Sequence, residues 1–299
     1  MPGMIEMRCD GPVLCFGGPY SNLQSLQALL AEAGRRGIPP GRMLCTGDVV
    51  AYCADAAATL DLMMASGIAT VMGNCEESLA AGGADCGCGF AAGTACDRLS
   101  QDWFAHASRQ VTPRHRDWMA ALPRRIEVRI GGRRLMALHG GATVINRFLF
   151  ASAPEAVLAA EIAATGAEGV IAGHCGMPFT RLAGARPGGG RGLWHNAGAI
   201  GMPADDGTPR GWFSVLTPEP EGLRIEHLAL DYDHAAAARA MRRAGLGDAY
   251  RAALSSGLWP SADVLPPAER ARRGRPLAAS HVLWPRAGHG AGGACTGLP

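Results

Sequence analysis

Short apolar runs recur along the chain, and glycine-rich turns bound most of them. We expect strands at 12–16, 42–46, 68–72, 125–130, 133–139, 169–174, 193–198, 211–216 and 223–230. Between the early runs, apolar residues at helical spacing predict helices at 23–33, 56–65 and 154–165. Strands that alternate with helices at first and then dominate favour an α/β sandwich of sheets.

The stretch VLCFGGPYSNLQSLQALL, residues 13–30, has the pattern that opens α/β hydrolytic enzymes. An apolar strand runs into a tight turn, and a helix with leucines at helical spacing follows. The turn that should carry the chemistry offers only Gly17, Gly18, Pro19 and Tyr20. The sequence therefore raises the question of whether the active site has been lost or moved.

Composition divides the chain into a main part, an insertion and a tail. We expect one domain over 1–258, with a glycine- and cysteine-rich insertion that begins at 78 and ends at 121. Its second half, 101–121, predicts two amphipathic helical segments around Pro113, and the alanine-rich segment 234–257 also predicts helix. Residues 259–299 are rich in Pro and Gly and predict a C-terminal tail.

Charge and hydropathy exclude some classes of partner. The formal net charge is only +2 and no long basic run is present, so we expect no nucleic-acid polymer as partner. No apolar run approaches the ~20 residues of a membrane span. The N-terminal segment MPGMIEMRCDGP has no apolar core of a secretory signal, so a cytoplasmic location is expected.

The chain holds ten cysteines, which is many for a protein in a reducing compartment. Such a count favours metal or thiol chemistry over a disulfide framework. Cys15 and Cys45 lie inside apolar runs and are expected to be small buried hydrophobic residues.

Polar side chains follow four of the predicted strands. They are Asp48, Asn74, His139 and His174. Each has an ordinary interpretation as a cap, a turn residue or a hydrogen-bonded histidine. Ligand sites in open α/β sheets gather beyond the carboxyl ends of the strands, so all four can converge on one point. A carboxylate, an amide and two imidazoles suit Mn, Fe or Zn, with positions left for water or substrate.

These residues belong to five segments that follow one another between Val13 and Trp259. The segments are GDVVAYCADAAATLDLM, VMGNCEESL, LMALHGG, GVIAGHCGMPF and HNAGAIGMPADDGTPRGWFSVL. In order and spacing they resemble motifs of the calcineurin-like metallophosphoesterases, particularly the small bacterial phosphodiesterase branch. The resemblance implies an α/β fold in which two mixed β-sheets pack face to face as a sandwich, with helices outside.

In that family two metal ions share a bridging aspartate. One ion is also held by the Asn of a GNH motif, the His of an HG motif and the first His of GH-x-H. The resemblance implies that this set is complete here, as Asp48, Asn74, His139 and His174.

The other ion loses every ligand that it does not share. Gly18 and Tyr20 stand where the family has an Asp-x-His pair, and Gly176 replaces the last His of GH-x-H. Random loss of ligand residues would affect both sets of ligands. The observed pattern therefore favours one divalent ion per chain. A phenolate from Tyr20 could still reach that ion, although a pocket or core tyrosine is the ordinary interpretation.

Cys75 stands where the family has the histidine that contacts the phosphoryl group and assists the leaving oxygen. A thiol performs that role less well near neutral pH. As a thiolate it could act as a nucleophile or bind a soft metal. Cys53 and Cys175 lie on loops that we expect around the same pocket.

Residues 78–121 fall where relatives carry a cap over the active site. Cys86, Cys88 and Cys96 form a C-x-C-x7-C pattern there, which matches no standard zinc or iron–sulfur spacing. Three interpretations stay open: a second metal bound by these thiols, a redox-responsive disulfide, or unreactive packing.

Together these patterns predict a divergent metal-dependent hydrolase of phosphoesterase type, in which a single ion activates water. We expect a small-molecule substrate, with a phosphate ester as one candidate. Asp48, Cys75, Tyr20 and Arg147 are the candidate catalytic residues. Arg147 or Arg210 could supply positive charge at a phosphate, although surface salt bridges are the ordinary role of such residues.

Two alternatives remain. The first is a non-phosphatase metalloenzyme in which the metal and Cys75 act on a thiol, sulfur-rich or metalloid substrate. The second is a catalytically silent protein that uses the old cleft to bind a metal or a nucleotide.

Overall fold

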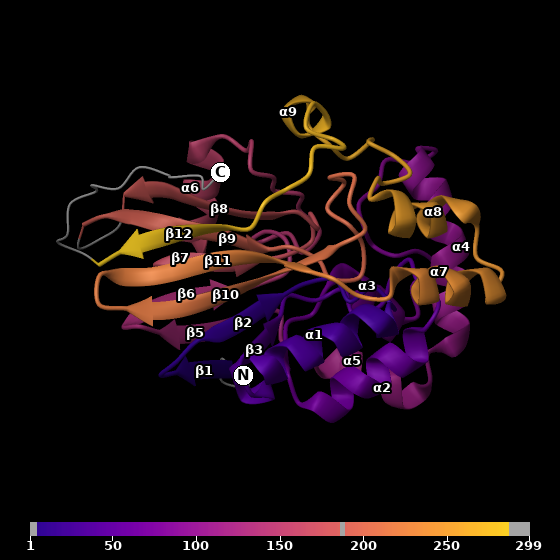
Figure 1. Ribbon diagram of the computed structural model, residues 1–299, viewed down its shortest axis with the longest axis horizontal. Helices are drawn as coiled ribbons and strands as arrows, with labels where there is room; N and C mark the ends of the chain where they lie inside the picture. The colour runs from indigo at the N-terminus through magenta and orange to yellow at the C-terminus, as the bar shows by residue number, and fades with distance from the viewer. Residues whose placement is uncertain (1–4, 186–188, 287–299) are drawn as a thin grey trace.

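The computed structural model describes residues 5–185 and 189–286 and contains two six-stranded β-sheets packed face to face. Helices flank the sheets, as Figure 1 shows. This architecture confirms the predicted α/β sandwich.

The strand order of each sheet brings distant segments together. The first sheet runs β1 (Ile5–Cys9), β5 (Ile126–Ile130), β6 (Arg133–Ala137), β7 (Gly169–Ala172), β9 (Arg191–Ala197), β8 (Pro178–Ala185). The second runs β12 (Ser280–Pro285), β11 (Gly222–Leu230), β10 (Gly211–Glu219), β2 (Val13–Phe16), β3 (Met43–Cys45), β4 (Ala69–Thr70). Within them β6, β7 and β9 are parallel, as are β2, β3 and β4. The polar loops that follow these parallel strands can therefore meet at one end of the sandwich.

Alternating side chains build the core between the sheets. In β5, Ile126, Val128 and Ile130 are buried, whereas Glu127 and Arg129 are not. The buried set packs with residues of the opposite sheet, among them Leu216, Ile225 and Trp284. This period of two orients one face of the strand toward the other sheet.

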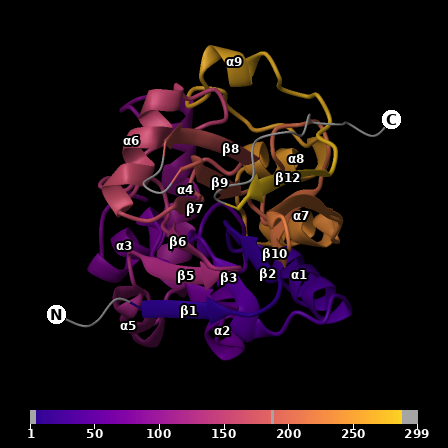
Figure 2. The ribbon, with the colours of Figure 1, turned by 90° about the vertical axis from the view of Figure 1, so that its left-hand side faces the viewer.

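Helices bury the outer faces of the sheets. On the second sheet α1 (Leu23–Arg35) and α2 (Ala56–Ser66) pack in one cluster with β2 and β3, and on the first α6 (Glu155–Thr165) packs on β7–β9. Figure 2 shows α6 and α1 on opposite sides of the molecule. The remaining helices are α3 (Asn74–Ala81), α4 (Ala95–Gln110), α5 (Pro113–Ala121), α7 (His234–Arg243), α8 (Asp248–Ser256) and α9 (Pro267–Arg270). Among the described helices, none combines the length and apolar composition needed to cross a bilayer.

The insertion and the C-terminal segment both contribute residues near the end of the sandwich where the polar loops meet. Residues 82–94 form a loop between α3 and α4, and Cys88 and Phe90 of that loop line a cavity described below. In the segment assigned to a tail, Trp259 lines the same cavity and β12 pairs with β11. The last residues of that segment, 287–299, lie outside the described residues.

Candidate metal centre

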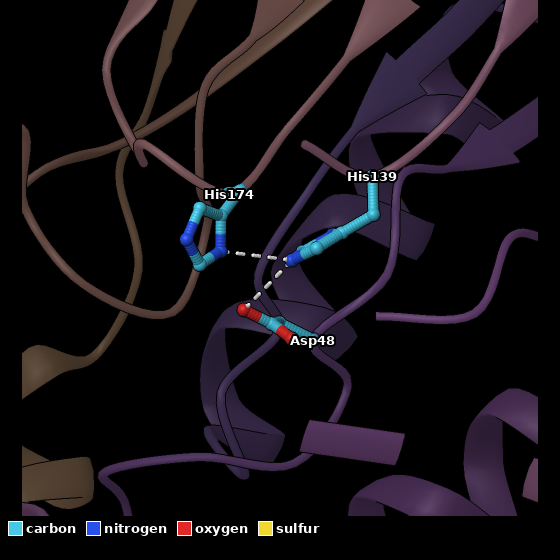
Figure 3. A group of neighbouring side chains, drawn as sticks. All are labelled: Asp48, His139 and His174. Atoms are coloured by element: carbon cyan, nitrogen blue, oxygen red, sulfur yellow. Dashed lines mark hydrogen bonds and ion pairs between the residues drawn. The ribbon is translucent and has the colours of Figure 1, made fainter. Parts of the chain in front are cut away.

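Four loops deliver the predicted ligand residues to one point. Asp48 follows β3, and Asn74 begins α3 shortly after β4, both beside the second sheet. His139 and His174 follow β6 and β7 of the first sheet. Figure 3 shows Asp48, His139 and His174 pointing toward one another. The site therefore lies where the ends of the two sheets meet.

The imidazole of His139 is the centre of this cluster. Its Nε2 atom lies 3.0 Å from Asn74 Oδ1, 3.1 Å from His174 Nδ1 and 3.3 Å from Asp48 Oδ2. One ligand atom each from Asp48, His139 and His174 fall within 4.8 Å of one another, and all three side chains are buried. The four residues singled out by the sequence thus come together in space.

The hydrogen bonds of His139 and Asn74 turn an acceptor atom of each side chain inward. His139 Nδ1 donates to the Thr46 carbonyl at 2.6 Å, so the neutral ring presents the lone pair of Nε2 to the cluster. Asn74 Nδ2 donates to the Cys86 carbonyl at 2.8 Å, so the amide oxygen points inward. A proton on Nε2 could satisfy one of the facing acceptors, whereas a cation satisfies them all. The donor set therefore fits a metal ion, with Thr46 orienting its histidine ligand.

The charges of Asp48 and His174 agree with this interpretation. Burial would raise the pKa of Asp48, but the adjacent His139 and His174 rings lower it below its usual value. Burial would lower the pKa of His139, but Asp48 raises it. Burial, with His139 beside it, lowers the pKa of His174 to about 3. At neutral pH Asp48 is ionised and His174 is a neutral imidazole, the forms in which these residues bind metals.

Glu76 ties the Asp48 loop to the start of α3. Its buried carboxylate accepts hydrogen bonds from the backbone N–H groups of Asp48 at 2.8 Å, Val50 at 3.1 Å and Gly73 at 3.0 Å. Burial and the nearby Asp48 raise the pKa of Glu76 to about 7. Glu76 is a residue of the site that was not predicted from the sequence, although an acidic residue in the first turn of a helix is a capping signal.

Two of the four residues hold an unusual backbone conformation. Asp48 has φ 56° and His174 has φ 61°, in the left-handed region that non-glycine residues seldom adopt. Such strain persists where the surrounding structure enforces it, and it clusters at functional sites. The strain thus accompanies the placement of these two side chains.

A small aromatic cavity opens beside Asp48 and His174. It has about 60 Å³ of free space. Its lining is mainly aromatic and aliphatic, with Tyr20, Tyr52, Phe90, Phe148, Tyr250, Trp259, Met202 and Val264 among the side chains. Phe148 packs against the His174 ring, with 4.1 Å between ring centroids. No arginine or lysine of the described residues lines it.

Other residues predicted from the sequence lie elsewhere. The Arg147 guanidinium pairs with Glu161, and that of Arg210 lies 3.6 Å from Asp206, so neither reaches the cavity. Cys75 is buried outside the cavity lining, and burial raises the pKa of its thiol well above the usual value. Neither a thiolate nucleophile at Cys75 nor a phosphate contact from Arg147 is supported by this arrangement.

Tyr20 does lie in the cavity, but as a packed aromatic ring. Burial, followed by the nearby Asp48 charge, raises the pKa of its phenol well above the usual value. The ring packs edge-on against Tyr52, with centroids 4.8 Å apart. A phenolate at Tyr20 is therefore disfavoured.

Comparison with solved structures shows which known fold this chain shares. No family model matches the sequence, and no curated protein matches it. A metallophosphoesterase structure from Sphaerobacter thermophilus is 19% identical, with a TM-score of 0.65, over 84% of this chain and 100% of that one. A hypothetical protein from Pyrococcus horikoshii OT3 is 13% identical, with a TM-score of 0.67, over 83% and 99% of the two chains. The chain has the metallophosphoesterase fold, as the sequence motifs predicted.

Proposed function

We propose that this protein is a metal-dependent hydrolase of phosphoesterase type that works with one divalent ion. Asp48, Asn74, His139 and His174 would hold the ion. The main observation behind the proposal is that acceptor atoms of Asp48, Asn74 and His174 lie close to Nε2 of His139. The other nitrogen of that ring, Nδ1, donates to the Thr46 carbonyl.

The packing of Tyr20 and Trp259 supports one ion rather than two. A β-carbon added at Gly18 would overlap the Tyr20 ring. One added at Gly176 would lie 3.6 Å from the Tyr20 hydroxyl and 3.5 Å from Cζ2 of Trp259. Tyr20 and Trp259 thus occupy the region toward which ligands at positions 18 and 176 would project, which supports a mononuclear site.

Residues around the proposed ion would position its ligands and exclude bulk water. A divalent ion at this position supplies Lewis-acid activation of a water nucleophile. Thr46 fixes the tautomer of His139, and Glu76 fixes the backbone that carries Asp48. The aromatic lining excludes bulk water and so strengthens electrostatic interactions inside the cavity.

The lining and the volume of the cavity limit the kind of substrate that the site can take. Since no guanidinium or ammonium group of the described residues lines it, positive charge for a phosphate ester must come from the ion. The free space of about 60 Å³ suits a small group rather than a polymer. We therefore propose a small phosphate ester that inserts only part of itself into the cavity.

A silent binding protein is the second candidate. The aromatic lining without a cationic side chain is the observation that favours it, because phosphoryl transfer is assisted by positive charge around the phosphate. The alternative that uses Cys75 as a nucleophile has no such support, since this thiol lies outside the cavity lining.

Hydrolysis of a chromogenic phosphate ester after loading with Mn²⁺ tests the proposal. We expect turnover that needs the metal, falls at least about a hundredfold in His139→Ala, and persists in Cys75→Ala. His281→Ala, at an exposed histidine of β12, is the matched control. Metal binding without turnover of any ester would favour the silent protein. Activity that survives His139→Ala would overturn the proposed site.

A further inference from the structure

The loop between α3 and α4 closes a small ring with a disulfide between Cys86 and Cys88. Both residues are buried, at 3% and 5% exposure. Cys88 nevertheless lines the cavity beside Asp48 and His174, so a small molecule in the cavity faces this residue. Among the described cysteines the other seven are free thiols.

This disulfide ring is bonded directly to one of the proposed metal ligands. The Cys86 carbonyl accepts the hydrogen bond from Asn74 Nδ2 that turns the amide oxygen toward His139. The same nitrogen lies 3.4 Å from Cys88 Sγ. Both cysteines therefore fix the orientation of the Asn74 amide.

A second connection reaches the loop that follows His139. Asn146 Nδ2 donates to the Gly87 carbonyl, between the two cysteines, at 2.9 Å. Asn146 lies in the loop between β6 and α6, which begins with the stretch that carries His139. A β-carbon on Gly89 would lie 2.9 Å from Asn146 Nδ2, so the loop approaches Asn146 closely. The ring closed by the disulfide thus contacts Asn74 and the loop that follows His139.

We propose that the Cys86–Cys88 disulfide is a thiol-exchange site that a small thiol reaches through the cavity. The redox state of this disulfide sets the affinity of the metal centre by way of Asn74. The inference rests on the proposed metal site. Of the three interpretations that the spacing of Cys86, Cys88 and Cys96 left open, the proposal selects the redox-responsive disulfide.

The exchange proceeds in two balanced displacements. A thiolate attacks Cys88 Sγ, the sulfur–sulfur bond breaks, and its electron pair goes to Cys86 Sγ, which takes up a proton. A second thiolate then attacks the sulfur of the first thiol in the mixed disulfide, and Cys88 leaves and is protonated. Two external thiols are oxidised to a disulfide, while Cys86 and Cys88 are reduced to thiols.

Opening the ring releases the carbonyl that holds Asn74. The residues that orient a metal ligand affect affinity nearly as much as the ligands, typically about 10- to 100-fold on removal. We therefore expect the reduced protein to bind the ion about tenfold or more weakly. Mn²⁺ is the suitable probe, because it prefers oxygen and nitrogen and does not seek the freed thiols.

The test compares the oxidised protein with protein reduced by a small thiol and then desalted without oxygen. Alkylation and mass spectrometry count the thiols, and calorimetry measures Mn²⁺ affinity. We expect two additional alkylated cysteines, 86 and 88, and the loss of affinity on reduction. A Cys86→Ser/Cys88→Ser variant should bind weakly whatever the redox state, and Cys96→Ser, at a free thiol lining the same cavity, should keep the redox response.

The outcomes separate this inference from the proposed function. Equal Mn²⁺ affinity before and after the two cysteines open would overturn the inference and leave the metal site standing. Alkylation of both cysteines in the untreated, air-purified protein would overturn it as well. Absence of Mn²⁺ binding in both redox states would overturn the metal site itself, and the effect on affinity with it.

Discussion

A β-carbon added to Gly18 would overlap the aromatic ring of Tyr20. The two residues are therefore matched: the ring needs a glycine at position 18, and the left-handed backbone there, with φ 46°, also suits a glycine. Tyr20 itself has φ 53°. Under the proposed single-ion site, this ring takes the volume that a metal ligand at position 18 would need.

This relationship predicts opposite outcomes for single and combined substitutions. Gly18→Asp alone should lower the free energy of unfolding by roughly 1–3 kcal/mol, because its side chain collides with Tyr20. Gly18→Asp with Tyr20→His and Gly176→His removes the ring and supplies ligands, so it should raise the bound metal from one ion per chain toward two. Urea denaturation and elemental analysis measure the two effects. If the single variant were as stable as the parent, the packing interpretation would be wrong.

Glu76 should affect both stability and metal binding, although it is not one of the proposed metal ligands. Glu76→Ala leaves three backbone N–H groups without their acceptor, so we expect a loss of about 3 kcal/mol in stability and weaker metal binding. Glu76→Gln keeps one acceptor oxygen and should lose less. Glu77→Gln, at a partly exposed neighbour that pairs with Arg124, is the control and should change stability little. Equal effects at both positions would show that the carboxylate of Glu76 does not organise the site.

A buried polar chain between the sheets predicts loss of stability in acid. The Thr180 hydroxyl lies 2.8 Å from His227 Nε2 and 2.9 Å from His195 Nδ1, and His195 Nε2 lies 2.7 Å from the Ser214 hydroxyl. Burial lowers the pKa of His227 from 6.5 to about 4, and burial with His227 nearby lowers the pKa of His195 well below its usual value. Both rings are therefore neutral in the folded protein at neutral pH.

The sign of the pH dependence follows from these shifts. Between about pH 6.5 and 4 the unfolded chain takes up protons that the folded histidines do not, so stability falls as the pH falls. His227 alone should contribute about 3 kcal/mol across this window. Urea midpoints measured from pH 7 to 4 should therefore decline less steeply in His227→Gln than in the parent. His281→Gln, at an exposed histidine, should leave the slope unchanged, and a parental slope in His227→Gln would refute the assignment.

Residues 280–285 should be needed for the stability of the sandwich. Trp284 of β12 is buried in the core between the sheets, its indole N–H donates to the Arg191 carbonyl at 2.8 Å, and Arg133 lies over its ring. Trp284→Ala should therefore lower the free energy of unfolding by about 3–5 kcal/mol. Leu283→Ala, on the exposed face of the same strand, should cost much less. Similar losses at the two positions would mean that β12 is not packed as described.

Much of the fold could be predicted from the sequence, because its strands carry short apolar runs that end in glycines. The nine predicted strands are all present. Three other strands among the described residues were not predicted, and each has a physical reason. The strand β1 carries Glu6 and Arg8 at a sheet edge, β8 mixes polar and small residues, and β12 follows a Pro- and Gly-rich segment. Their pairing depends on partners distant in the chain, which local patterns do not reveal.

The cluster of ligand candidates could also be predicted, since each residue follows a strand and strand ends converge. The surroundings could not. The sequence gives no indication that Arg147 pairs with Glu161, or that Tyr20 fills the space beside Gly18. Nor does it show that Trp259, from a segment assigned to a tail, lines the cavity. Side-chain direction and long-range contact decide these features, and neither is encoded in residue spacing.

An anomalous-scattering map from crystals grown with Mn²⁺ tests the central claim most directly. The account predicts a single peak within ligand distance of Asp48 Oδ2, Asn74 Oδ1, His139 Nε2 and His174 Nδ1, and no second peak beside Tyr20. A map with no peak among these four atoms, or with two ions of equal strength there, would contradict it.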